Sequence, residues 1–284
     1  MGWSLLLWVS PALGAYAVFV LYPLAQTFRY SFYSWDGIGA AHYVGLSNYR
    51  RVFTQSELYS SIVNSLILII YFSIIPVCLG LLCAVLMREL KARGVGGAIR
   101  AFLFLPQVIP LAGAAIAWTW MYSQDGVVNQ ALGAVGLGSQ QHDWLGNFST
   151  ALPAVGVIGT WVATGFCTIL LLVGIGKIDP SLYEAARLDG AGRWREFLAV
   201  TLPDLRPEIV VCVTVTTISA LASFDVVYIA TNGGPGYTTM VPGLEIFQLT
   251  FLQQEVGQAS ALAVVLVVLV LAVIVPIQRF GRRR

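Results

Sequence analysis

Six long apolar segments, separated by shorter polar ones, set the pattern of this chain. Each is long enough to cross a bilayer, because a helix rises about 1.5 Å per residue and roughly 20 residues span the hydrocarbon core. The pattern predicts an all-α integral membrane protein with six transmembrane helices, in which residues 1–284 form a single transmembrane domain. The predicted spans cover about residues 3–25, 60–87, 100–122, 151–176, 207–229 and 258–278.

The composition agrees with a membrane protein and excludes a soluble one. Hydrophobic residues make up 57% of the chain and charged residues only 11%, and the mean hydropathy is +0.78. A soluble domain could not cover its surface with so few polar side chains. The formal net charge of +2 gives no indication of a nucleic-acid partner, so the lipid bilayer is the expected surrounding.

The positions of the basic residues predict the orientation. Thirteen of the sixteen Lys and Arg residues lie between spans two and three, between spans four and five, or after span six. Cytoplasmic loops carry the excess of positive charge, so these segments and both termini are expected on the cytoplasmic side. The thirteen are Arg88, Lys91, Arg93, Arg100, Lys177, Arg187, Arg193, Arg195, Arg206, Arg279, Arg282, Arg283 and Arg284.

Four residues in or near the spans are candidates for a solute path. Asp225 lies near the outer end of predicted span five, and an ionisable residue inside a span is costly and therefore a functional candidate. Reaching the interface or pairing with a neighbouring helix explains Asp225 equally well. Trp161 and Thr164 in span four, with Tyr228 near the end of span five, could contact a sugar through an aromatic face and a hydroxyl.

Prolines and aromatic residues in the spans allow further expectations. Pro76 in span two and Pro106 and Pro110 in span three can bend their helices and open space for a solute, although such bends also serve packing. Trp120 and Tyr122, at the end of span three, are expected at the membrane interface, where amphipathic rings are enriched.

The loop between spans four and five, residues 177–206, predicts two short helices with a turn between them. Asp179 and Pro180 form a good helix start, and Gly190 suits the left-handed position that ends a helix. A second helix fits Gly192–Val200, with Pro203 closing it. A charged loop alone is ordinary on the cytoplasmic face, but the small residues Ala185 and Ala186 give the first helix a flat face for docking.

The order of residues in this loop closely resembles a known family. It resembles the EAA loop of permease subunits of binding-protein-dependent ABC importers, in its sugar-permease form. The matching residues are Glu184-Ala185-Ala186, Asp189-Gly190-Ala191, Phe197, and Thr201-Leu202-Pro203. Similar stretches cover nearly the whole chain. They are YPLAQTFRYSFYSWDG (22–37), YVGLSNYRRVF (43–53), FDVVYIATNGGPG (224–236) and ASALAVVL (259–266).

The resemblance implies a type I permease fold in a bacterial cell membrane. The chain would form half of a translocation path for a carbohydrate or related polar solute, beside a second, different permease subunit. An external binding protein would deliver the solute, and two cytoplasmic ATPase subunits would carry Mg-ATP. Glu184, Ala185, Ala186, Asp189 and Gly190 match the positions of the coupling helix that contacts the ATPase.

The chain itself shows no motif for catalysis or for a cofactor. Gly176-Lys177 lacks both the leading glycine and the following Ser or Thr of a phosphate loop, and no metal-ligand or nucleophile motif is present. The chain is therefore expected to be a transport subunit without its own ATP site. The alternative is a transporter driven by an ion gradient with Asp225 as its ion site, which predicts more buried acids and an internal repeat.

Overall fold

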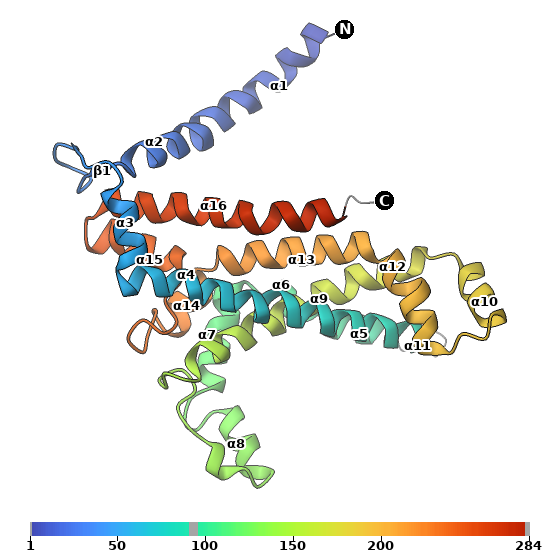
Figure 1. Ribbon diagram of the computed structural model, residues 1–284. Coiled ribbons are helices and arrows are strands. Elements are labelled where there is room, and N and C mark those ends of the chain that lie inside the picture. Colours follow the sequence, from blue (N-terminus) through green and yellow to red (C-terminus); the bar gives the residue numbers. More distant parts are fainter. Residues whose placement is uncertain (1, 91–95, 282–284) are drawn as a thin grey trace.

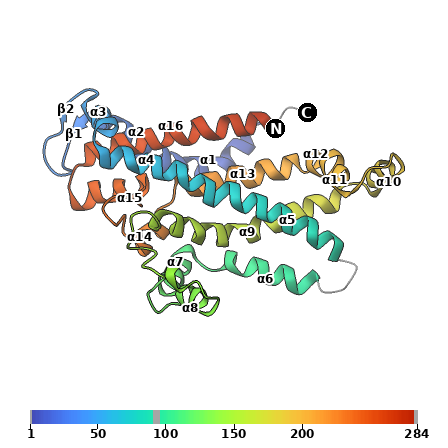
Figure 2. The same cartoon turned by 60° about the horizontal axis from the view of Figure 1, so that its bottom comes forward.

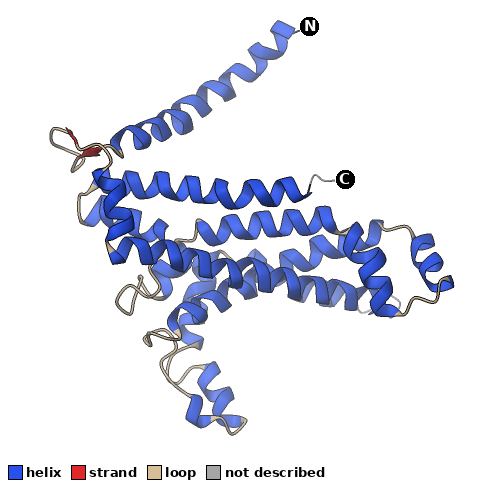
Figure 3. Cartoon of the chain, viewed as in Figure 1, coloured by secondary structure: helices blue, strands red, loops and turns tan. Residues whose placement is uncertain are grey.

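A computed structural model describes residues 2–90 and 96–281 of the chain. The described residues form a bundle of long helices with shorter helices at both ends (Figure 1). The strands of this part of the chain are confined to one antiparallel hairpin, β1 (Tyr33–Ser34) with β2 (His42–Tyr43), as Figure 3 shows. The predicted all-α class is confirmed.

Four of the predicted spans are continuous helices in the described residues. All four are long and apolar enough to cross a bilayer. The π-helical turns η1 and η2 interrupt the first two without ending them. The four are α1–η1–α2 (Gly2–Tyr16, Ala17–Leu21, Tyr22–Tyr30), α4–η2–α5 (Ser56–Ile69, Ile70–Ile74, Ile75–Leu90), α9 (Ala151–Lys177) and α16 (Val256–Gly281).

The third predicted span is not one straight helix. It consists of α6 (Gly96–Val108) and α7 (Leu111–Met121), which meet at an angle of 97°. Pro110 causes the break, because it has no N–H to donate and disfavours the helical conformation of the residue before it. The bend expected at this proline is therefore confirmed, and the span predicted over 100–122 is a pair of bent helices.

The fifth predicted span is also interrupted. Helix α13 (Arg206–Leu221) has 16 residues, and α14 (Asp225–Ala230) begins after a gap of non-helical residues. Sixteen residues of helix reach about 24 Å, less than the hydrocarbon thickness. A single helix over 207–229 was the wrong prediction. By length and composition the described residues contain four spans, or five if α6 and α7 count as one, where the sequence predicted six.

The two ends of the bundle differ in content. One end carries the hairpin, α3 (Ser47–Thr54), α14, α15 (Pro242–Phe247) and η6 (Gln248–Leu252), while α10 (Pro180–Leu188) and α11 (Arg193–Glu196) extend from the other (Figure 1). The start of α1 and the end of α16 lie at the α10 end in both Figure 1 and Figure 2. The start of α1, the end of α16 and the charged loop thus share one end of the bundle. That this end faces the cytoplasm stays a prediction.

Close packing in the bundle depends on glycines of α9. A Cβ atom at Gly159 would lie 2.2 Å from the ring of Phe72, and one at Gly156 would lie 2.4 Å from the ring of Tyr71. Both rings belong to η2, so the two helices approach too closely for any side chain at these positions. This contact fixes α9 against α4–η2–α5 at the centre of the bundle.

Two regions extend away from the packed bundle, although α2 still contacts α16. The first helix diverges from the others in Figure 1, and its apolar segment Trp8–Tyr30 contains no buried residue. The second region is α8 (Val127–Ala134) with the following turn η4 (Gly138–Gln140), which projects beside α7. Tyr122, just before this region, is 5% exposed and donates a hydrogen bond to the Ala154 carbonyl, so its ring packs inside the protein. Its position at the membrane interface stays a prediction.

Candidate functional site

The first helix of the charged loop starts where the sequence predicts. Asp179 is the N-cap of α10, and its carboxylate accepts a hydrogen bond of 2.9 Å from the backbone N–H of Ser181. This hydrogen bond lowers the pKa of Asp179, because it stabilises the charged form. Pro180 occupies the first turn, where its missing N–H needs no partner.

The turn at Gly190 ends this helix as predicted. Gly190 has a φ of +76°, in the left-handed region that favours glycine. Its N–H donates to the Arg187 carbonyl at 3.0 Å, and the N–H of Ala191 donates to the Ala186 carbonyl at 2.9 Å. These two bonds form a Schellman motif, which sets the direction in which the chain leaves α10.

The surface of the loop combines small, charged and apolar residues. Glu184, Ala185 and Asp189 are exposed, and Ala186 is half-buried. Two large apolar side chains that the sequence argument missed, Leu188 and Trp194, are 89% and 71% exposed. Both could have been noticed in the sequence as large apolar residues inside a charged loop. Exposed apolar residues surrounded by charged ones are typical of a protein contact surface.

The second helix of the loop is longer than predicted. It begins with α11 at Arg193 and continues through the π-turn η5 (Phe197–Thr201) into α12 (Leu202–Asp204), so Pro203 does not close it. A π-turn interrupts the regular hydrogen-bond ladder directly before this proline, so the missing N–H of Pro203 is accommodated.

The four predicted path residues do not form one site. Asp225 is the exposed first residue of α14, a short helix that is not one of the long apolar helices. Tyr228, on the same short helix, stacks on Phe224 with ring centroids 5.3 Å apart. On α9, Trp161 contacts Trp118, and the Thr164 hydroxyl donates to the Thr160 carbonyl at 2.7 Å.

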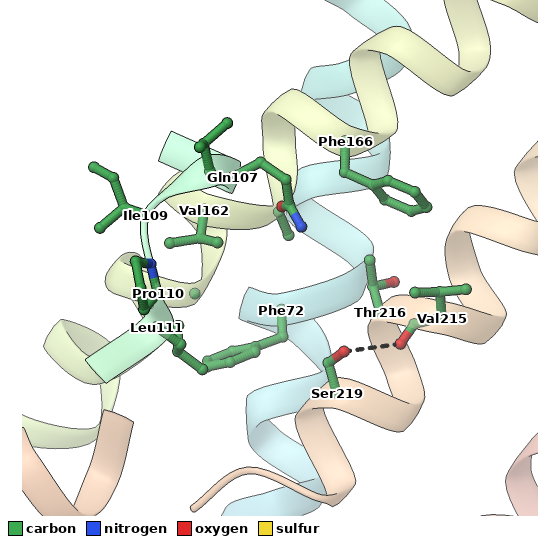
Figure 4. A pocket seen from close by; sticks show the side chains of 13 residues that line it. Phe72, Gln107, Ile109, Pro110, Leu111, Val162, Phe166, Val215, Thr216 and Ser219 are labelled. Carbon is green, nitrogen blue, oxygen red and sulfur yellow. Dashed lines mark hydrogen bonds between the residues drawn. The ribbon is translucent and has the colours of Figure 1, made fainter. Parts of the chain in front are cut away.

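A cavity of about 440 Å³ lies instead at the break between α6 and α7 (Figure 4). Its walls come from η2, from the break itself, from α9 and from α13. The described residues that line it include no ionisable group. They are Phe72, Gln107, Val108, Ile109, Pro110, Leu111, Gly159, Val162, Ala163, Phe166, Val215, Thr216 and Ser219.

Three uncharged polar side chains face this mainly apolar space. Gln107 points from the end of α6 into the space between α9 and α13, and Ser219 donates to the Val215 carbonyl at 3.0 Å (Figure 4). Thr216 donates to the Ser73 hydroxyl at 2.7 Å. An apolar wall with a few hydroxyl and amide groups suits a neutral polar molecule better than an ion.

An apolar helical bundle with a broken helix at a cavity, and an exposed charged loop at one end, has the architecture of a membrane transport subunit. A family model described as "Binding-protein-dependent transport system inner membrane component" matches residues 77–280. The chain belongs to this family and is a multi-pass permease subunit of a binding-protein-dependent ABC importer. The predicted family is confirmed.

Similar proteins cover nearly the full length of the chain. The trehalose/maltose transport system permease protein MalF of Thermococcus litoralis is 35% identical over 286 residues, which cover 98% of this chain and 93% of that protein. The lactose transport system permease protein LacF of Rhizobium radiobacter is 32% identical over 284 residues, covering 99% and 94%.

A solved structure shows the same fold. It is the crystal structure of a bacterial ABC transporter involved in the import of the acidic polysaccharide alginate. One of its chains matches with a TM-score of 0.81 and 23% identity, covering 99% of this chain and 96% of the other. The predicted permease fold is therefore confirmed.

Proposed function

We propose that this chain forms half of the path by which an ATP-driven importer carries a carbohydrate or a related polar solute. The observation that carries the proposal is the 35% identity to a trehalose/maltose permease over almost the whole chain. The cavity at the α6–α7 break supports it, because its polar groups are uncharged. The other half would be a second, different permease subunit, and an external binding protein would deliver the solute.

The energy source is proposed to lie on other chains. Two cytoplasmic ATPase subunits would bind Mg-ATP, since the sequence of this chain lacks a phosphate loop. Glu184, Ala185, Ala186, Asp189 and Gly190 would form the contact with one ATPase subunit. The exposure of this helix and of Leu188 supports a docking surface at the end of the bundle. This end would face the cytoplasm of a bacterial cell.

The solute path is proposed to run through the cavity rather than along the four residues first selected. Trp161 and Thr164 flank Val162 and Ala163, which line the cavity, and they would lie beside the path. Asp225 and Tyr228 lie on α14, at the end of the bundle where the binding protein would dock. An ion-driven mechanism based on Asp225 has lost its main support, because this residue is exposed and outside the spans.

The test is to purify the chain in mild detergent from its native host and to identify the associated proteins by mass spectrometry. We expect an ATPase, a second permease and a binding protein. The purified complex is then placed in liposomes with radiolabelled trehalose, maltose and lactose as probes. Uptake that requires Mg-ATP and the binding protein supports the proposal, whereas sugar uptake by the chain alone without ATP contradicts it.

A further inference from the structure

Glu196 is a buried carboxylate held between two arginines from different segments. The residue is 8% exposed and lies at the end of α11. From α10, Arg187 donates to both of its carboxylate oxygens, at 3.0 Å from Nε and 3.3 Å from Nη2. From the end of α5, Arg88 Nη2 lies 3.6 Å from Oε1. The carboxylate therefore joins the charged loop to a long helix of the bundle.

Two further contacts close this cluster. The guanidinium carbon of Arg88 lies 3.7 Å from the centroid of the Tyr183 ring, and Tyr183 is only 4% exposed. The Tyr183 hydroxyl lies 3.2 Å from the Thr201 hydroxyl in η5. These contacts connect α5, α10, α11 and η5. We call the five residues that make them the loop clasp: Arg88, Tyr183, Arg187, Glu196 and Thr201.

The geometry distinguishes the loop clasp from an ordinary surface ion pair. Exposed pairs contribute little because water screens them. The side chains of Arg187 and Arg88 are 61% and 34% exposed, but the Glu196 side chain that they share is only 11% exposed. A carboxylate removed from water requires paired charges and hydrogen bonds, which the two arginines supply. The bidentate contact with Arg187 also fixes the orientation of the guanidinium relative to the Glu196 carboxylate. It raises the pKa of Arg187.

The clasp has a direct connection to the cavity. Arg88 and Phe72 lie on the same continuous helix, α4–η2–α5, and Phe72 lines the cavity. Sixteen residues separate them, so the helix carries the connection over about 24 Å. A displacement of α10 that also displaces Arg88 would therefore be carried along this helix, past Pro76, to a wall of the cavity.

We infer that Glu196 is a positioning residue that makes the charged loop and α5 move as one rigid body during transport. The inference rests on the proposed function, because an attached ATPase must supply the displacement of α10. It adds a second connection between loop and bundle, besides the covalent ones through α9 and α13. Without the clasp, α10 would still dock on the ATPase, but only part of its displacement would be transmitted to α5.

The experiment measures this rigidity in the purified complex with its ATPase, in liposomes. Spin labels are attached at Leu86 of α5 and Leu182 of α10, both exposed, after the four native cysteines are replaced by alanine. We expect one narrow distance distribution that Mg-ATP does not change. In Glu196→Gln the distribution should broaden with Mg-ATP, and uptake of radiolabelled trehalose or maltose per ATP hydrolysed should fall about fivefold.

Two other variants complete the design. Arg88→Gln should reproduce the broadening, and the double variant should be no worse than either single one, because residues of one network are not additive. Glu208→Gln is the matched control. Glu208 has a similarly buried side chain, 15% exposed, and pairs with Lys177 at 3.3 Å, but this ion pair joins the last residue of α9 to α13 and includes no residue of α10 or α5. We expect no broadening in that variant.

Several results would overturn the inference. A narrow distribution in both Glu196→Gln and Arg88→Gln would do so, as would equal broadening in Glu208→Gln or additive effects in the double variant. If the unmodified complex drives ATP-dependent uptake, such a result refutes the loop clasp alone. If the unmodified chain moves sugar without ATP, the proposed function and the inference both fail.

Discussion

The charged loop and the central cavity use polar groups in opposite ways. In the loop, a buried carboxylate is paired with two arginines while large apolar side chains such as Leu188 are exposed. In the cavity, the described lining residues carry no charge, and hydroxyl and amide groups face an apolar wall. The loop is therefore specified by exact backbone and ion-pair geometry, whereas the cavity is specified by volume and neutral polarity. Each region should be sensitive to a different kind of substitution.

The largest effect is expected from the backbone of the loop. Gly190→Val places a β-branched residue at a φ of +76°, which costs about 1–2 kcal/mol and turns α10 away from its docking direction. We expect uptake in the reconstituted complex to fall at least about tenfold, the factor that 1.4 kcal/mol represents. ATP hydrolysis should continue.

Gly192→Val is the matched control for this variant. A Cβ atom at either glycine meets no atom within 4 Å, but Gly192 has a φ of −73°, which valine adopts easily. Uptake should stay close to that of the unmodified complex. Equal loss in both variants would show that the size of the side chain, and not the left-handed turn, is responsible.

A smaller effect is expected from filling the cavity. Val162→Phe adds volume to the α9 wall, and an overfilled site costs about 1–3 kcal/mol. We expect sugar uptake to fall about fivefold, with ATP hydrolysis retained. Val157→Phe makes the same change on the same helix at a 39% exposed position, and it should have no effect. Identical results for the two variants would place the path elsewhere.

The smallest effect is expected from one hydroxyl. Ser219→Ala removes a polar group from the cavity wall, and a hydrogen bond contributes about 0.5–1.5 kcal/mol. We expect the concentration of sugar-loaded binding protein at half-maximal uptake to stay constant and the maximal rate to fall about threefold. The control is Val211→Ala, which removes two methyl groups at an exposed position of α13. An unchanged rate in Ser219→Ala would exclude contact between this hydroxyl and the solute.

The helices of the fold were largely predictable, but their interruptions were not. Apolar segments of about 20 residues predicted the positions of α4–α5, α9 and α16, because a bilayer restricts both the length and the composition of a helix that crosses it. The break after Leu221 escaped notice, since Ala222 and Phe224 continue the apolar run across it. At Pro110 the residue type predicted a bend, but the angle of 97° between α6 and α7 depends on packing and could not be predicted from the sequence.

The loop was predicted more accurately than the cavity. Asp179 and Gly190 have local roles that their residue types reveal, and the structure places both as expected. On α9 the sequence selected Trp161 and Thr164, whereas Val162 and Ala163 line the cavity. Consecutive helical residues point about 100° apart, and a span that is apolar all round gives no signal of which face points inward.

The absence of buried residues in the first helix has a consequence for how the chain is made. The three apolar clusters of the described residues contain no residue before Tyr49, and the segment Trp8–Tyr30 contributes no buried residue. Because a helix satisfies its own backbone hydrogen bonds in lipid, this segment can enter the bilayer while the rest of the chain is still being synthesised. Membrane insertion of the nascent chain can thus begin before any tertiary packing exists, and the two processes become separate steps of its biogenesis.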